Sequence, residues 1–163
     1  MYVTGACFFI LVLAVSAVWD RSIRWLHFFQ AWMYLATIFL GLRRNRWGYF
    51  IGITAAGMWM YIGVFGTTFF ANGLHELAGL IHSGRVKRPD QLIAVPAWFS
   101  NLFVVLGCIW AYFRLPNKSV RDIARLGVAL VLTSGFFALD MAITQPRYLP
   151  LFRSILHPRS PWR

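Results

Sequence analysis

Five long apolar runs, separated by short polar segments, organise this chain. They cover residues 2–19, 25–42, 47–70, 93–113 and 120–144. Each run is close to the roughly 20 residues that a helix needs to cross a hydrocarbon core of ~30 Å. Inside lipid, a spanning helix satisfies all of its backbone hydrogen bonds within its own segment. The pattern therefore predicts an all-α, polytopic transmembrane helical bundle with about five spanning helices.

Local signals at the ends of the runs agree with helices. Pro96 falls in the first turn of the fourth run, where the missing N–H costs little. Ser119, followed three residues later by Asp122, is typical of a capping box that begins the fifth run. The first run could instead be a signal peptide, because Val15-Ser16-Ala17 resembles a cleavage site. No basic residues precede this run, so we interpret it as a retained spanning helix.

The segment between the third and fourth runs, residues 71–92, is too polar to cross a membrane. Within it, Leu74, Leu77 and Ile81 share one helical face. This pattern predicts a short amphipathic helix over about 72–83, lying at the membrane interface. Residues 1–145 thus form a single predicted bundle, followed by a basic, proline-rich C-terminal tail over 146–163.

Composition supports lipid as the natural solvent. The chain is 59% hydrophobic and only 13% charged, whereas soluble domains average about 25% charged residues. The net charge of +11 could suggest nucleic acid. However, the basic residues form short clusters between apolar runs, as in proteins that place Lys and Arg at anionic lipid headgroups. We therefore expect an integral membrane protein, in a bacterial cytoplasmic (inner) membrane, with anionic lipid at its basic loops and no nucleic-acid partner.

Five spans divide the loops between two sides of the membrane. Side A holds the N-terminus and residues 43–46 and 114–125, and side B holds residues 20–24, 71–92 and the tail. Arginines follow the first run but do not precede it, which favours the N-terminus outside and the C-terminus inside. Four of the five acidic residues and all four histidines lie on or near side B. Side B is therefore where we expect polar chemistry.

Four polar residues of the second run recur at helical spacing. His27, Gln30, Tyr34 and Thr37 are three, four and three residues apart, which places them on one face of a helix. Because polar groups facing lipid are costly, this face is expected to point into the bundle. Two interpretations remain open: the residues form hydrogen bonds between helices, or they form one wall of a binding cleft.

Asp140 is the most informative single residue, because it lies in the apolar context FFALDMAIT. A carboxylate inside a membrane is costly unless it is paired or protonated, so it is either functional or structurally paired. His27 lies at a comparable depth from side B, and Gln30 and Asn101 lie somewhat deeper. A pair between His27 and Asp140 is geometrically possible. The predicted ligand-binding residues are His27, Gln30, Tyr34, Asn101 and Asp140.

The sequence predicts no metal site. Its two cysteines form no CxxC pair. His75 and His82 are seven residues apart, whereas the HExxH motif of zinc proteases spaces its histidines four apart, so that both reach one ion. Haem is a low-ranked cofactor with His27 as its candidate ligand. A second ligand from His75 or His82 would require their helix to fold inward.

Small residues at intervals of four allow membrane helices to approach closely. Two such series occur: Gly48, Gly52 and Ala56 in the third run, and Ser134, Ala138 and Ala142 in the fifth. The pattern does not distinguish packing within the chain from contact with another subunit.

No phosphate-binding glycine loop, nucleophile elbow or glycosidase-like carboxylate pair occurs, so a non-enzymatic role is favoured. In length, spans and tryptophan content the chain is similar to the tryptophan-rich sensory (translocator) proteins. It lacks their proline-rich first loop with paired Trp and Pro, so we transfer no ligand from that family. The first hypothesis is an accessory or scaffold subunit of a larger membrane complex. The second is a small-molecule binder or carrier, and the third a haem- or quinone-binding redox protein.

Overall fold

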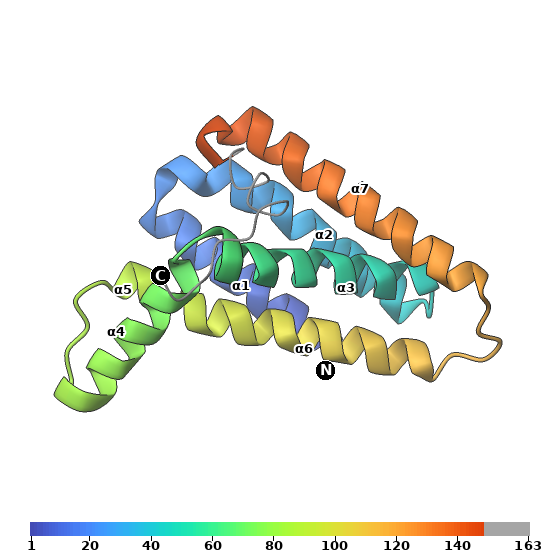
Figure 1. Cartoon of the computed structure of the whole chain (residues 1–163), viewed down its shortest axis with the longest axis horizontal. Coiled ribbons are helices and arrows are strands. Elements are labelled where there is room, and N and C mark those ends of the chain that lie inside the picture. Colours follow the sequence, from blue (N-terminus) through green and yellow to red (C-terminus); the bar gives the residue numbers. More distant parts are fainter. Residues whose placement is uncertain (149–163) are drawn as a thin grey trace.

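The computed structural model describes residues 1–148, which contain helices and no strands (Figure 1). The predicted tail beyond residue 148, including His157, lies outside the described residues. The elements are α1 (Tyr2–Trp19), η1 (Arg21–Ile23), α2 (Arg24–Leu42), α3 (Arg46–Tyr61), η2 (Ile62–Gly66), α4 (Phe69–Ser83), α5 (Pro89–Leu92), α6 (Ala94–Phe113), α7 (Arg121–Thr144) and η3 (Pro146–Tyr148). Five helical segments of the described chain are long and apolar enough to cross a membrane: α1, η1–α2, α3–η2, α5–α6 and α7.

Four of these segments form a closed group. Around it, α1 contacts α2, α2 contacts α3, α3 contacts α6, and α6 contacts α1. The last helix, α7, packs on α2 and α3, along the opposite side of the bundle from α6 (Figure 1). Helix α4 projects obliquely from the side B end of the bundle. The molecule is therefore a four-helix group with α7 added to one face.

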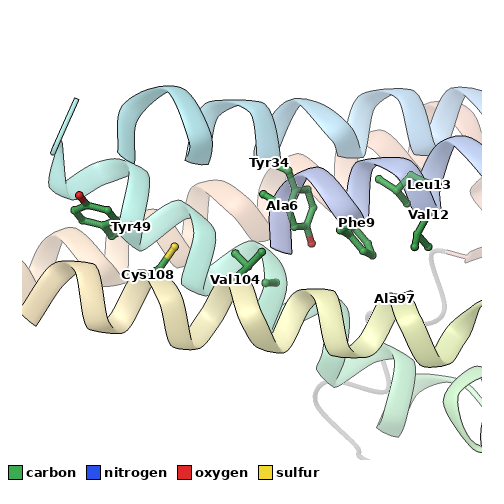
Figure 2. Close-up of a cluster of buried hydrophobic side chains, with 10 residues drawn as sticks. Ala6, Phe9, Val12, Leu13, Tyr34, Tyr49, Ala97, Val104 and Cys108 are labelled. Carbon is green, nitrogen blue, oxygen red and sulfur yellow. The ribbon is translucent and has the colours of Figure 1, made fainter. Parts of the chain in front are cut away.

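The main core lies inside the four-helix group (Figure 2). The Phe9 ring is central, because its centroid lies 4.5 Å from that of Tyr34 and 5.0 Å from that of Trp59. The buried side chains of this cluster are Ala6, Phe9, Val12, Leu13, Tyr34, Tyr49, Ala56, Ala97, Val104 and Cys108. Aromatic rings in edge and tilted contacts pack favourably. They fill the centre of the group where α1 and α2 meet α3 and α6.

Close approach of helices depends on two glycines of α3. A Cβ atom on Gly48 would lie 2.5 Å from the backbone nitrogen of Gly41 on α2. A Cβ atom on Gly52 would lie 2.7 Å from both Cys108 Sγ on α6 and Thr37 Cγ2 on α2. The first small-residue series, to which Ala56 also belongs, therefore serves packing within the chain.

The second small-residue series makes a looser contact. Ser134 Oγ donates to Met58 Sδ at 3.5 Å, which joins α7 to α3. Ala138 is half-buried and Ala142 is exposed. The close contact between α7 and α3 therefore does not extend along the whole series to the end of α7.

The third span ends earlier than the sequence indicates. It closes with the π-helix η2 at Gly66, after which Thr67 adopts extended backbone. Thr67 Oγ1 accepts a hydrogen bond from the backbone N–H of Phe69 at 3.3 Å, and α4 begins at Phe69. The assignment of residues 67–70 to the third span was wrong, and the following helix starts three residues before the predicted position 72. The apolar run continues through this break, so hydropathy does not detect it.

Glu76 connects α4 to the loop that follows it. Its carboxylate accepts hydrogen bonds from the backbone N–H groups of Lys87, at 2.8 Å, and Arg88, at 3.1 Å. Although Glu76 is a charged residue of an amphipathic helix, its side chain is buried. Burial is compatible with the charge because two backbone donors solvate the carboxylate. The opposite face of α4 exposes Leu74 and Ile81.

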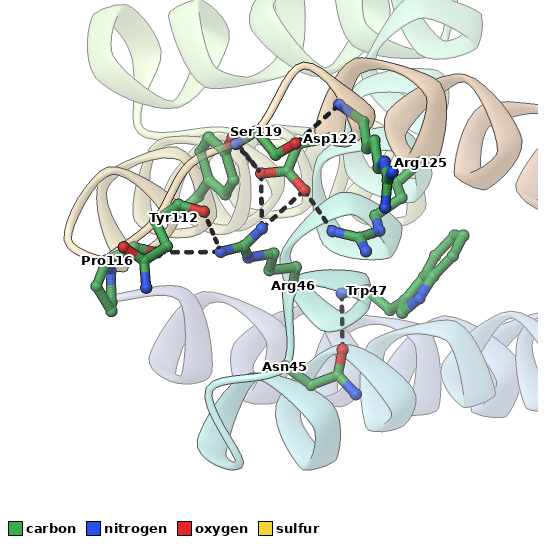
Figure 3. Close-up of polar contacts among 10 residues, drawn as sticks. Asn45, Arg46, Trp47, Tyr112, Pro116, Ser119, Asp122 and Arg125 are labelled. Atoms are coloured by element: carbon green, nitrogen blue, oxygen red, sulfur yellow. Dashed lines mark hydrogen bonds and ion pairs between the residues drawn. The ribbon is translucent and has the colours of Figure 1, made fainter.

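A dense polar cluster fixes the side A end of the bundle (Figure 3). We call it the side A ion cluster; it comprises Asp122, Arg46, Arg125, Tyr112 and Ser119. Asp122 Oδ1 accepts from Arg46 at 3.1 Å and from Arg125 at 2.6 Å. Its Oδ2 accepts from Arg46 and the Tyr112 hydroxyl, both at 3.0 Å, and from the Ser119 backbone N–H at 3.1 Å. Asp122 thus joins the start of α3, the end of α6 and the start of α7.

Contacts at both ends hold α7 in place. On side A, Arg46 also donates to the carbonyl oxygens of Pro116 and Asn117 in the connecting loop. On side B, Gln145 and Arg147 donate to the backbone carbonyl and the hydroxyl of Ser22, respectively. The helix is attached near its two ends, and between them it packs mainly on α2 and α3.

Candidate functional site

A half-open cavity of about 250 Å³ lies in the side B half of the bundle, where α7 meets α2 and the end of α3. Most of its surface is apolar, with three aromatic residues, two methionines and a few polar side chains. The residues that line it are Ile23, Leu26, His27, Gln30, Met58, Trp59, Ile62, Gly63, Thr67, Phe69, Phe137 and Met141. We call this space the side B cavity. Small-molecule sites in proteins share this apolar lining with a few convergent polar groups.

The local structure of α3 and η2 leaves the space open. The π-helix contributes Ile62 and Gly63 to the wall, and π-helical turns occur frequently at functional sites. A Cβ atom on Gly63 would meet only the Trp59 ring, at 3.8 Å. A side chain at position 63 would therefore enter the cavity without striking backbone.

Gln30 is the main polar group of the cavity. Its side chain is only 4% exposed, and its Oε1 atom has no hydrogen-bond partner within residues 1–148. A buried amide oxygen without a donor costs on the order of 1–3 kcal/mol. Native proteins rarely leave such groups unpaired unless water, an ion or a ligand completes them. Gln30 therefore makes the cavity the candidate binding site.

His27 lies one turn from Gln30 on the same wall. Its Nδ1 lies 3.2 Å from the carbonyl oxygen of Leu13 on α1. Since a carbonyl oxygen can only accept, Nδ1 carries the hydrogen and Nε2 of the neutral ring is left as an acceptor. The structure shows no ion pair between His27 and Asp140, so the pair that the sequence allowed is not formed.

Asp140 lies on α7 between two cavity residues, Phe137 and Met141. It is 5% exposed and does not itself line the cavity. Its Oδ1 accepts only a long hydrogen bond, 3.4 Å, from Thr144 Oγ1, which also donates to the Asp140 backbone carbonyl at 2.8 Å. Its Oδ2 has no partner in the described part of the chain. Asp140 is therefore a buried carboxylate that its own surroundings leave almost unsolvated.

Tyr34 and Asn101 do not reach the cavity. Tyr34 donates to Asn101 Oδ1 at 2.6 Å, and Asn101 Nδ2 donates to the carbonyl of Ala97 at 2.8 Å. Both residues are fully buried in the main core. Tyr34 and Asn101 therefore join α2 to α6 by a hydrogen bond and do not form a cleft. Of the five predicted ligand-binding residues, His27 and Gln30 line the cavity, Asp140 adjoins it, and Tyr34 and Asn101 lie elsewhere.

Sequence reasoning did not find the wall formed by α3 and η2. Its members include Met58, Ile62 and Gly63. The one available signal was Trp59, a tryptophan placed deep in the membrane instead of at the interface, where tryptophans usually lie. The π-helix and the position of α7 have no local signature.

The described histidines other than His27 lie away from the cavity. His75 and His82 are exposed on α4, and neither lines the side B cavity. Among the described residues, no group of three or more His, Cys, Asp or Glu side chains is placed to hold a metal ion. Haem ligation by two described histidines of this chain would therefore require a different position of α4.

The polar groups at the two ends of the bundle differ in chemistry. In the side A ion cluster both oxygens of Asp122 accept several hydrogen bonds, which is typical of a structural clamp. At side B, Gln30 lines the cavity and Asp140 adjoins it in sequence on α7, and each retains a buried oxygen that is unpaired in the described part of the chain. Such an arrangement can hold a molecule with an apolar body and a polar end.

Comparisons with protein-family models, with curated proteins and with solved structures find no match for this chain. Its function therefore has to be inferred from the residues and geometry of the cavity.

Proposed function

We propose that this chain is an integral membrane protein that binds a small, mostly apolar molecule in the side B cavity. The observation that carries the proposal is Gln30, whose buried amide oxygen lacks a donor on the wall of an apolar cavity. Trp59 and Phe69 supply aromatic surface, and Met58 and Met141 supply side chains that adapt to irregular shapes. Together they favour hydrophobic contact with one directional polar contact.

The cavity favours a small-molecule binder over an accessory subunit of a membrane complex. The subunit hypothesis relied in part on small-residue helix faces, among them the Gly48, Gly52 and Ala56 series, and in part on the basic tail. Gly48 and Gly52 are in contact with α2 and α6 of the same chain. The series is therefore explained without a partner, whereas the unpaired oxygen of Gln30 is not explained within residues 1–148.

Filling the cavity should prevent binding. We expect Gly63→Leu to weaken binding of the neutral fluorophore N-phenyl-1-naphthylamine at least about tenfold, equivalent to ~1.4 kcal/mol. The physical reason is that the leucine side chain occupies the space beside Trp59. Binding is measured by fluorescence titration of the purified protein in lipid nanodiscs, after subtraction of the signal from empty nanodiscs.

Gly57→Leu is the matched control, because Gly57 lies in the same spanning segment, α3–η2, and its Cβ position faces open space outside the cavity. It adds the same side chain to that segment without filling the cavity. The control should bind the fluorophore as the wild type does. Equal binding by the wild type and both variants would overturn the proposal, since the fluorophore would then occupy some other surface.

A second function, an accessory subunit of a membrane complex, is favoured by a different feature. An open groove of about 610 Å³ runs between α3 and α7, and Gly57 and Gly127 lie along it. A Cβ atom on either glycine would meet nothing within 4 Å. Glycine inside a helix costs roughly 0.5–1 kcal/mol relative to alanine. Close approach of a helix from another subunit would account for glycines that this chain does not need for its own packing.

Substituting Gly127 tests this second function. If the groove receives another helix, wild-type protein extracted in mild detergent should migrate as an assembly larger than one chain, and Gly127→Leu should reduce it to a single chain. The size is measured by light scattering after gel filtration. Val131→Leu, at an exposed position of α7, is the control and should leave the size unchanged. A wild-type protein that is monomeric at all concentrations would contradict the subunit function.

A further inference from the structure

Two buried oxygen atoms at or beside the side B cavity lack a hydrogen-bond donor within residues 1–148. Gln30 Oε1 and Asp140 Oδ2 are buried without a donor among the described residues. His27 Nε2 is an acceptor as well, because Nδ1 faces the carbonyl of Leu13. An occupant that completes this site must therefore bring donors.

We propose that the ligand of the side B cavity is a lipophilic amine, bound as its ammonium ion. This inference rests on the proposed function, since it specifies the chemical class of the molecule in the same cavity. An ammonium group offers up to three N–H donors and no acceptor. It matches buried acceptors on α2 and on α7.

Asp140 supplies the charge that selects a cation. An unpaired carboxylate inside an apolar bundle is costly, and the cost falls when a cation or a proton compensates it. Asp140 lies between Phe137 and Met141, the two residues through which α7 contributes to the cavity wall. Asp140 therefore belongs to the segment of α7 that forms this part of the wall.

The cationic groups described nearby do not occupy this position. Arg147 donates to the hydroxyl of Ser22 at the end of the bundle. Arg21 and Arg24 are exposed on the side B surface. None of the three forms an ion pair with Asp140 among the described contacts.

The remainder of the lining fits the apolar body of an amine. Trp59 and Phe69 are 6.3 Å apart, centroid to centroid, with their planes nearly perpendicular. A ligand beside them meets an aromatic face, which attracts cations and packs against hydrocarbon. In contrast, a carboxylate or a quinone carries only acceptors toward Gln30 and Asp140. Such ligands would leave every unpaired oxygen of the site without a donor.

The test compares three ligands that share one skeleton. 4-Phenylbutylamine, 4-phenylbutan-1-ol and 4-phenylbutyrate compete with N-phenyl-1-naphthylamine for the protein in nanodiscs of zwitterionic phosphatidylcholine. We expect the amine to displace the fluorophore at a concentration at least about tenfold below that of the alcohol. The carboxylate should not displace it. Equal potency of amine and alcohol would overturn the inference while leaving the proposed function intact, because the fluorophore would still report the cavity.

Asp140→Asn isolates the contribution of the charge. The variant should lose the preference for amine over alcohol and still bind the fluorophore, which also reports that the protein is folded. Asp90→Asn removes the same charge from an exposed position on side B, and the preference should survive. If Asp140→Asn keeps the full preference, Asp140 is not the selecting group and the inference fails.

Two sources of an ammonium group are distinguished by changing the lipid. Nanodiscs in which part of the phosphatidylcholine is replaced by phosphatidylethanolamine present the amine as a lipid headgroup. Weaker fluorophore binding there, in the wild type but not in Asp140→Asn, identifies the lipid as an occupant. Unchanged binding assigns the site to free amines. The proposed function itself is refuted if the fluorophore binds the protein in no lipid. It is also refuted if the fluorophore binds and Gly63→Leu leaves that binding unchanged.

Discussion

Asp122→Ala is expected to lower the melting temperature by roughly 5–10 °C, the largest effect of any single polar substitution in the described chain. Asp122 is 3% exposed and receives hydrogen bonds from two arginines, a tyrosine and a backbone N–H. Its removal leaves Arg46, 23% exposed, without its carboxylate partner. Partial exposure of both arginines reduces the penalty below that of a fully buried pair.

Removal of the Asp122 carboxylate should mainly weaken the attachment of α7 to the rest of the bundle. Arg46 belongs to α3, Tyr112 to α6 and Asp122 to α7, so one carboxylate joins three helices. Thermal melting in detergent, followed by circular dichroism, measures the effect. Asp90→Ala is the control, because Asp90 forms an exposed ion pair with Arg88 that contributes little. A melting temperature for Asp122→Ala within about 1 °C of the control would show that the cluster is not a stabilising clamp.

Gly48→Ala is expected to destabilise the bundle by about 1–3 kcal/mol, although alanine is the better helix former. The new methyl group would lie 2.5 Å from the Gly41 backbone nitrogen and 2.8 Å from the Leu40 carbonyl carbon. Both atoms are backbone, so α2 and α3 must move apart. Reversible unfolding with increasing mole fraction of sodium dodecyl sulfate measures the free energy.

Gly57→Ala provides the comparison on the same helix. The substitution adds the same methyl group and the same gain in helix propensity, but its Cβ position meets nothing within 4 Å. It should leave stability unchanged or raise it by up to about 1 kcal/mol. If both alanine variants behave alike, the close approach of α2 and α3 at Gly48 is not required for stability.

The helical fold could be read from the sequence because long apolar runs directly report the length that a membrane requires. The break at Thr67 could not be read in this way. Residues on both sides of it are apolar, and the change to extended backbone becomes visible only with the hydrogen bond from Phe69 to Thr67. The burial of Glu76 likewise depends on a loop eleven residues later, whose N–H groups point back to the carboxylate.

The candidate site was predicted in part for similar reasons. Helical spacing placed Gln30 and Tyr34 on one face of α2, and both are buried. It could not tell which part of that face meets empty space. Tyr34 meets Asn101, 67 positions away in sequence, whereas Gln30 meets the cavity below α7. The partnership of Arg46 and Asp122, 76 positions apart, has no local signal either.

The position of α7 outside the closed four-helix group has a consequence for the order in which the protein is built. Helices α1, α2, α3 and α6 find all of their mutual contacts within residues 2–113. They can therefore pack while the ribosome is still synthesising residues 121–144, since membrane helices insert first and associate afterwards. Phe137 and Met141 arrive with the last span. The side B cavity is thus the last part of the bundle to be completed during synthesis.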